Sequence, residues 1–233
     1  MRITTTFFIA MILKFTTINC QTDIQSFGFK GNVKTVKYSI YTNFTKHDSA
    51  HLTANKNDLI SERYLYFNTI GNIDSTIETL YDMDKTEKLI THFHYANKKL
   101  KSTKKYRFGY NDVVEEVKYK YDEKEKTYEF KGISVSSFTG GHRKLDSNYR
   151  EIEGDYFQKS KKGVIHTSES YINIIDSTGN LIKTKFFNQI KGDYTILYKY
   201  KIIDAKENVI QIVLLYENAE TIFRFIKKEF TYY

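Results

Sequence analysis

Hydrophobic and polar residues alternate along much of this chain, and short polar turns interrupt the alternation at regular intervals. The clearest run is Glu116–Tyr121, which places Val117, Tyr119 and Tyr121 on one face and charged residues on the other. A period of two predicts a strand with one packed and one solvated face, as in antiparallel sheets.

A strand–turn–strand unit recurs with a period of roughly 27 residues. The strongest copies open their turn with Asn or Asp and place Gly three residues later. This suits a type I turn followed by a left-handed residue. Where Glu125 or Glu207 replaces that Gly, we expect a looser or longer turn. Five copies are recognised by their turns, at 68–72, 97–100, 122–125, 176–180 and 204–208.

Between these units the pattern predicts the remaining organisation of the chain. A first strand is expected over Gly31–Ile40, followed by a long loop or short helix over 42–61. The glycines and the Ser and Thr run of 132–148 predict the largest interior loop. The aromatic C-terminal stretch 223–233 predicts a final strand docked on the sheet.

The predicted fold class is therefore all-β, an antiparallel hairpin or meander repeat array with little helix. The pattern leaves closure open between an extended twisted sheet, a sandwich and a half-barrel. Register is open as well. Compared with the pair before Asp122, Tyr64/Tyr66 stands one residue further from its turn and Tyr198/Tyr200 three residues further, an odd offset in both cases. They would face the opposite side unless a bulge, or burial on both faces, intervenes.

The composition agrees with a single β domain that is large enough to bury a hydrophobic core. The chain has 233 residues, 40% of them hydrophobic, with 20 Tyr, 17 Phe and no Pro. Aromatic residues suit a pleated surface, and the absence of Pro suits continuous sheet. A low-GC genome explains the missing Pro equally well.

The formal charge of +8 does not indicate a nucleic-acid partner. Lys and Glu are interspersed along the strands, and only six residues are Arg. A nucleic-acid-binding face concentrates Lys and Arg and favours Arg for bidentate contacts. We expect a solvated sheet face instead.

The first twenty residues resemble a secretory signal peptide. Arg2 precedes the apolar run Phe7–Leu13, and a polar tail leads to Cys20. The run is too short to cross a bilayer as a helix. We expect residues 1–20 to be a signal peptide and 21–233 to form a single β-repeat domain. Because Lys14 interrupts the apolar region, a buried first strand is the alternative.

Cys20 has three interpretations. The stretch Thr17–Cys20 resembles a bacterial lipoprotein signal, which makes Cys20 the candidate lipidation site. Ordinary cleavage beside it would leave Gln21 first, or the thiol has no role. Because the chain has no second cysteine, it cannot form an intrachain disulfide. The expected location is an outer-membrane-anchored lipoprotein, the periplasm or the medium.

The recurring unit resembles the YD (Rhs-type) repeat of bacterial exported proteins. The matching positions are Tyr64, Tyr66, Asn68, Gly71, Asn72 and Ile73; Asp176, Gly179, Asn180 and Leu181; and Tyr119, Tyr121 and Asp122. Counting degenerate copies, the resemblance covers residues 62–215. The period is longer and less regular than in that family. The resemblance implies an exported hairpin array and no activity or functional residue.

Three acidic or histidine clusters could bind a metal but have simpler explanations. His92 and His94 fall on the face that the repeat assigns to solvent, and no third ligand is evident. The pair His47 and His51 lies in a polar loop. The stretch 82–87 lacks the glycine of a calcium loop.

The stretch Gly140–Arg143 with Asp146 is the candidate active-site loop, because functional groups concentrate in long loops. No nucleophile elbow, phosphate-cradling loop or spaced acid pair accompanies His142. We therefore expect no catalytic residue, no bound metal and no cofactor.

The favoured function is a non-catalytic exported cell-envelope protein that presents a sheet surface or edge to an unknown protein or polysaccharide. Membrane contact is expected only through a lipid anchor. The alternative is a binding module for glycans or envelope polymers that uses exposed aromatic residues. A hydrolase or metalloprotein centred on 132–148 is the third hypothesis.

Overall fold

The computed structural model describes residues 23, 27–42, 45–46, 52–54, 56–82, 85–97, 99–188, 192–217 and 222–233. Within these ranges the chain is almost all strand and turn, with one 3-10 turn at Lys56–Asp58. The strands are β1 (Val33–Tyr41), β2 (Thr45–Lys46), β3 (Leu52–Thr53), β4 (Leu59–Phe67), β5 (Ile73–Asp82), β6 (Lys85–Ala96), β7 (Lys99–Arg107), β8 (Val113–Asp122), β9 (Thr127–Ser134), β10 (Ser137–Leu145), β11 (Glu151–Ser160), β12 (Ile165–Ile175), β13 (Leu181–Asn188), β14 (Tyr194–Ile203), β15 (Val209–Tyr216) and β16 (Ile222–Tyr232).

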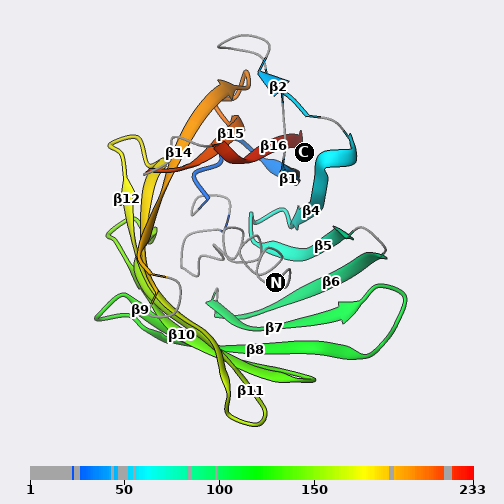
Figure 1. Cartoon of the computed structure of the whole chain (residues 1–233), viewed down its shortest axis with the longest axis vertical. Helices are drawn as coiled ribbons and strands as arrows, with labels where there is room; N and C mark the ends of the chain where they lie inside the picture. The colour runs from blue at the N-terminus through cyan, green and yellow to red at the C-terminus, as the bar shows by residue number, and fades with distance from the viewer. Residues whose placement is uncertain are drawn as a thin grey trace.

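Fourteen of these strands form a closed antiparallel barrel (Figure 1). Each strand from β4 to β16 pairs with its neighbours in sequence, and β1 closes the barrel between β16 and β4. The predicted all-β meander is confirmed, and so is the C-terminal strand. The extended sheet, the sandwich and the half-barrel were wrong, because the last strand finds the first and leaves no open edge in this sheet.

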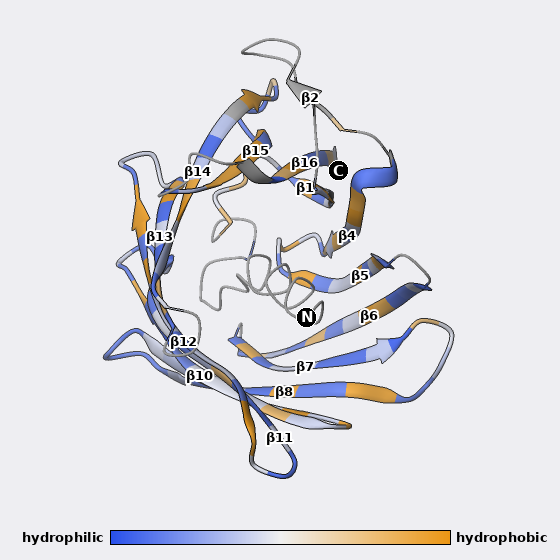
Figure 2. Cartoon of the chain, in the orientation of Figure 1, coloured by the Kyte–Doolittle hydropathy of each residue, from blue (hydrophilic) through white to orange (hydrophobic). Residues whose placement is uncertain are grey.

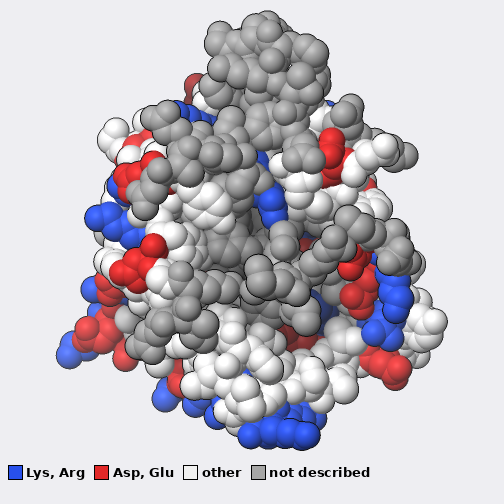
Figure 3. Space-filling view, in the orientation of Figure 1, with Lys and Arg blue, Asp and Glu red and all other residues white. Residues whose placement is uncertain are grey.

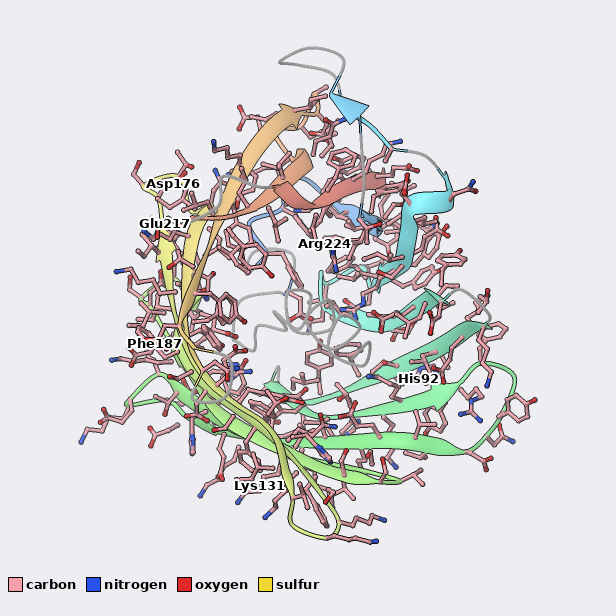
Figure 4. All side chains as sticks on the ribbon, viewed as in Figure 1. His92, Lys131, Asp176, Phe187, Glu217 and Arg224 are labelled. Carbon is pink, nitrogen blue, oxygen red and sulfur yellow. The ribbon has the colours of Figure 1, made fainter. Side chains whose placement is uncertain are left out.

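Several strands turn their apolar face into the barrel, whereas β12 exposes Ile172 and Ile174 outside and buries Glu169, Tyr171 and Asn173 inside. In β8, Val117 and Tyr119 line an interior pocket, while Lys118 and Lys120 are exposed outside. The antiparallel register places inner residues beside inner residues in neighbouring strands. Figure 2 shows hydrophilic and hydrophobic positions mixed along the strands. Figure 4 shows the consequence for labelled residues, with Arg224 on the inner side of the wall and Lys131 on the outer side.

Two buried clusters fill parts of the interior. The larger one is built from residues of β1, β4, β12–β16 and the preceding segment, including Phe29, Val36, Tyr38, Leu65, Ile196 and Leu214. The smaller one contains Leu100, Tyr128, Phe130, Leu145 and Tyr156. Burying one such side chain contributes about 1.5–3 kcal/mol, so the inner face is the main source of stability.

The predicted repeat turns at 68–72, 97–100, 122–125, 176–180 and 204–208 connect successive hairpins at one end of the barrel, here called the Asx end. The turn 146–150 lies at the same end. Gly71 and Gly179 have φ of 95° and 96°, as predicted. In both turns the opening Asn or Asp accepts backbone N–H bonds from residues two and four positions later.

The expectation for Glu207 was wrong. Asp204 Oδ1 accepts the N–H groups of Lys206 and Asn208 at 2.8 Å each, so the turn matches the Gly copies. Glu207 itself takes a φ of 65°. The hydrogen bonds of Asp204 therefore determine the turn, and Glu207 adopts the left-handed conformation at an energetic cost. In the 122–126 turn the geometry does differ, since Lys126 has the positive φ.

The register question has two answers. In β14 the ladder shifts between Tyr200 and Ile202, and this bulge keeps Tyr198 and Tyr200 inside the barrel. In β4 the ladder with β5 shifts only after the pair, between Tyr66 and Phe67. Tyr64 and Tyr66 therefore stay on the outer face, opposite the inward Leu65, and stack at 6.4 Å.

The predicted interior loop at 132–148 is absent. Residues 127–145 form the hairpin β9–β10, and the glycines lie in strands because neighbouring groups approach their backbone closely. A Cβ at Gly140 would lie 2.7 Å from Phe157 Cζ, and one at Gly141 would overlap the Asp155 carbonyl. The 42–61 segment contains β2, β3 and the 3-10 turn, and β4 begins earlier than predicted, at Leu59.

The outer wall is charged. Figure 3 shows Lys and Arg interspersed with Asp and Glu around the molecule. Outward charged residues on β8–β11 and β13 include Glu116, Lys118, Lys131, Lys144, Glu153 and Lys185. Apolar side chains, among them Ile172, Ile174 and Phe187, are exposed between these charges. In barrels that cross membranes the lipid-facing band is apolar, and a Lys on that face costs about 2–4 kcal/mol at the midplane. Among the described helical residues, no helix is long and apolar enough to span a bilayer.

Candidate functional site

The main interior feature is a cavity of about 740 Å³ in the lumen. Its wall comes from β1, β4, β12, β14, β15 and β16, from the turns of the Asx end and from residues 27–30. The wall is largely apolar and aromatic; it includes Leu65, Tyr198, Tyr200, Ile212 and Ile226. This volume lies within the range of pockets that bind small molecules, about 300–1,000 Å³.

Residues 27–30 border the cavity and are fixed by specific contacts. Asn208 accepts the Lys30 N–H at 2.7 Å and donates to the Lys30 carbonyl at 3.0 Å. The Phe29 ring packs edge-on against Phe67 and Phe230, with centroids 6.2 and 5.1 Å away.

Asp23, just before this segment, is fixed to β5 and β6. Its buried carboxylate accepts the Ile73 N–H at 2.6 Å and the Tyr95 hydroxyl at 2.5 Å. Burial raises the pKa of Asp23 to about 6, although both hydrogen bonds act to lower it. Residues 23 and 27–30 therefore belong to the barrel interior.

Most of the charged side chains inside the barrel are paired. Ion pairs join Arg63 to Glu78 at 2.5 Å, and Lys105 to Glu115 at 3.0 Å. The pairing offsets part of the desolvation that burial imposes on each charge.

Arg143 forms the third interior pair, with Glu151 at 3.3 Å. Its guanidinium also lies over the rings of Phe130 and Tyr171, 4.6 and 5.1 Å from their centroids. Gly154 makes room for it, since a Cβ there would lie 2.7 Å from Arg143 Cδ. Burial raises the pKa of Glu151 to about 7, against the lowering effects of Arg143 and a Tyr128 hydrogen bond.

Lys228 differs from these cations. It lies in the cavity wall, with its ammonium 5.5 Å from the Phe29 ring and 5.3 Å from the Tyr38 ring. In the described part of the chain no carboxylate pairs with it, and burial alone lowers its pKa to about 8. The ring faces stabilise an ammonium by cation–π attraction but do not neutralise it.

The predicted active-site residues do not meet. His142 points outward and lies 3.3 Å from the exposed Asp155, whereas Arg143 points into the barrel. Asp146 anchors the next turn and pairs with Arg150 at 2.7 Å. Alternation along β10 sends His142 and Arg143 to opposite faces, and Asp146 lies in the turn after it, so the three candidate side chains do not form one site.

The other sequence candidates lie on the surface or outside the described residues. His92 and His94 are exposed on the outer face of β6, the face that the repeat had assigned to solvent. Asp82 and Lys85 pair across the β5–β6 hairpin. Within the described ranges no three metal-binding side chains gather. The signal segment 1–20 with Cys20, and the pair His47 and His51, lie outside the described residues.

Sequence reasoning missed the cavity and Lys228. A signal for Lys228 was present, because the inner face of β16 reads Arg224, Ile226, Lys228, Phe230, and a lysine on an apolar face is unusual. The cavity itself depends on barrel closure, which the pattern did not resolve. Apolar and aromatic side chains form much of the wall, and polar groups converge on the same space, including Arg63, Asn173 and Lys228. A mainly apolar wall with converging polar groups is typical of a site that binds small molecules.

Comparisons with known proteins show similarity of fold. No family model matches the chain, and no curated protein sequence matches it. Among solved structures, a porin-like protein from Bacteroides vulgatus ATCC 8482 is similar with a TM-score of 0.51 and 13% sequence identity, over 86% of this chain and 98% of that one. A porin-like protein from Bacteroides uniformis ATCC 8492 covers 87% and 98%, with 10% identity and a TM-score of 0.40. At this identity the first likeness shows the antiparallel barrel fold alone.

Proposed function

We propose that this protein is a non-catalytic barrel of the bacterial cell envelope that holds an apolar small molecule in its lumen. The cavity of about 740 Å³ behind an inward apolar face carries the proposal. Apolar surface facing a cavity gains free energy when a matching ligand displaces water from it, at about 25 cal/mol per Å².

The proposed location rests on two lines of support. The leader-like pattern of residues 1–20 is typical of export. The similar solved structure is described as porin-like, which agrees with an envelope protein. The charged outer wall favours a barrel that stands in water, either free in the periplasm or tethered through Cys20, over one that inserts its wall into lipid.

The earlier hypothesis of docking through a sheet edge loses its support in the barrel, whose strands are paired on both sides. Docking on the outer wall stays a proposal. A glycan platform has weaker support, because most of the aromatic residues described here line the interior.

A matched pair of substitutions tests lumen binding. Ile175 lines the cavity, whereas its neighbour Ile174 is exposed on the outer face. Ile175→Trp should fill part of the cavity and weaken the binding of Nile red, an uncharged fluorescent probe. Ile174→Trp should bind the probe as the wild type does. Equal binding by both variants, or no binding by the wild type, would refute the proposal.

A further inference from the structure

We propose that the ligand of the lumen is an anionic amphiphile and that Lys228 binds its charged head group. The inference rests on the proposed lumen-binding function and names the chemical class of the ligand. It covers amphiphiles whose head group is a carboxylate or a phosphate.

The position of Lys228 in the wall is well defined. Lys228 pairs with Tyr38 across β16 and β1, and Tyr38 pairs with Arg63 across β1 and β4. The three side chains therefore form a row on the inner face, and all three line the cavity. The adjacent Lys227 is exposed on the outer face, where it pairs with Glu229 at 3.1 Å.

The charge of Lys228 is the feature that points to an anion. Arg63 has Glu78 as its partner, but Lys228 has only the aromatic faces of Phe29 and Tyr38 in the described structure. Lys228 is half-buried, and a partly desolvated ammonium without a counter-charge is unfavourable unless something pairs with it. An anionic head group would supply the missing counter-charge.

The carboxylates of the cavity wall do not fill this role. Among the lining residues, Glu151 is paired with Arg143, and Glu207 lies in an exposed turn at the Asx end. The apolar side chains around Lys228 instead offer a path for a hydrocarbon tail. Ile226 lies two residues away on the same face, and Ile212 is its partner on β15. An anionic amphiphile would place its head group against the Lys228 ammonium and its tail against the apolar side chains of β15 and β16.

The test compares three probes with the same tail: palmitate, hexadecyl phosphate and hexadecan-1-ol. Dissociation constants are measured on the purified, delipidated protein by displacement of Nile red. The wild type should bind one or both anions roughly 10- to 100-fold more tightly than the alcohol, the usual effect of a charge-assisted contact. Which anion binds more tightly identifies the head group.

Lys228→Met should lose this preference while it keeps its affinity for hexadecan-1-ol, and Lys227→Met should behave as the wild type. Retained alcohol binding shows that the variant is folded. If the alcohol and both anions bind equally to the wild type and to Lys228→Met, the head-group inference is wrong but lumen binding stands. If none of the three probes binds the wild type, lumen binding itself is wrong.

Discussion

Replacing Lys228 by Met should stabilise the empty barrel at neutral pH, although it removes a charged group from the binding site. Burial lowers the pKa of this lysine from 10.5 to about 8. Because one pKa unit corresponds to 1.36 kcal/mol, the protonated side chain is about 3 kcal/mol less favourable in the folded than in the unfolded chain.

The loss of two favourable contacts reduces the gain. The methionine loses the cation–π contacts with Phe29 and Tyr38, each worth about 0.5–1 kcal/mol. Met has a similar length and fills the same space, so little cavity is created. We expect a net stabilisation of about 1–2 kcal/mol at pH 7 in urea unfolding of ligand-free protein.

The pH dependence identifies the cause. Below pH 8 the lysine is protonated in both states, and the full penalty is present. Between pH 8 and 10.5 the unfolded chain binds more protons than the folded one, so wild-type stability from this group rises with pH. The advantage of Lys228→Met should therefore fade by pH 10.5. Lys227→Met should change stability by less than about 0.5 kcal/mol. A destabilised Lys228→Met, or a gain independent of pH, would show that Lys228 is not an unpaired buried charge.

Three further predictions concern stability. Gly179 and Glu207 both have positive φ, so Gly179→Ala should destabilise the protein by about 1 kcal/mol or more and Glu207→Gly should stabilise it by about 0.5–1 kcal/mol. If thermal unfolding shows that both substitutions change stability in the same direction, the shared turn geometry is contradicted. Arg143→Ala should cost about 3 kcal/mol or more, because Glu151 stays buried without its cation, and a loss under 1 kcal/mol would refute the pairing. Because burial raises the pKa of Glu151 to about 7, the folded state binds an extra proton between pH 4.5 and 7, and the contribution of Glu151 to stability falls as pH rises through this range. Glu151→Gln should flatten this part of the plot of stability against pH. An unchanged plot would contradict the raised pKa.

The strands and most turns could be predicted from the sequence because they are encoded locally. The alternation in Glu116–Tyr121 specifies one inner and one outer face, and the Asp176–Asn180 turn carries its own hydrogen-bonding side chain. The conformation of Glu207 could not be predicted from its residue type, because the hydrogen bonds of Asp204 outweigh the preference of Glu for negative φ.

Closure and the cavity could not be predicted, because they depend on pairing between residues far apart in the chain. The contact of β1 with β16 joins Val36 to Phe230, and neither local pattern indicates its partner. The glycines of β10 were mistaken for loop signals, since their reason is the approach of Asp155 and Phe157 from the next strand. Lys228 becomes informative only when the inner face is known.

The position of a bound amphiphile tests the account most directly. A crystal structure of the protein with a fatty acid that is brominated at the end of its tail would locate the bromine by its anomalous signal. We predict bromine density inside the barrel against the inner faces of β15 and β16, with the carboxylate within hydrogen-bonding distance of Lys228 Nζ. Bromine bound only on the outer wall, around Ile172 and Phe187, would contradict a lumen-binding function.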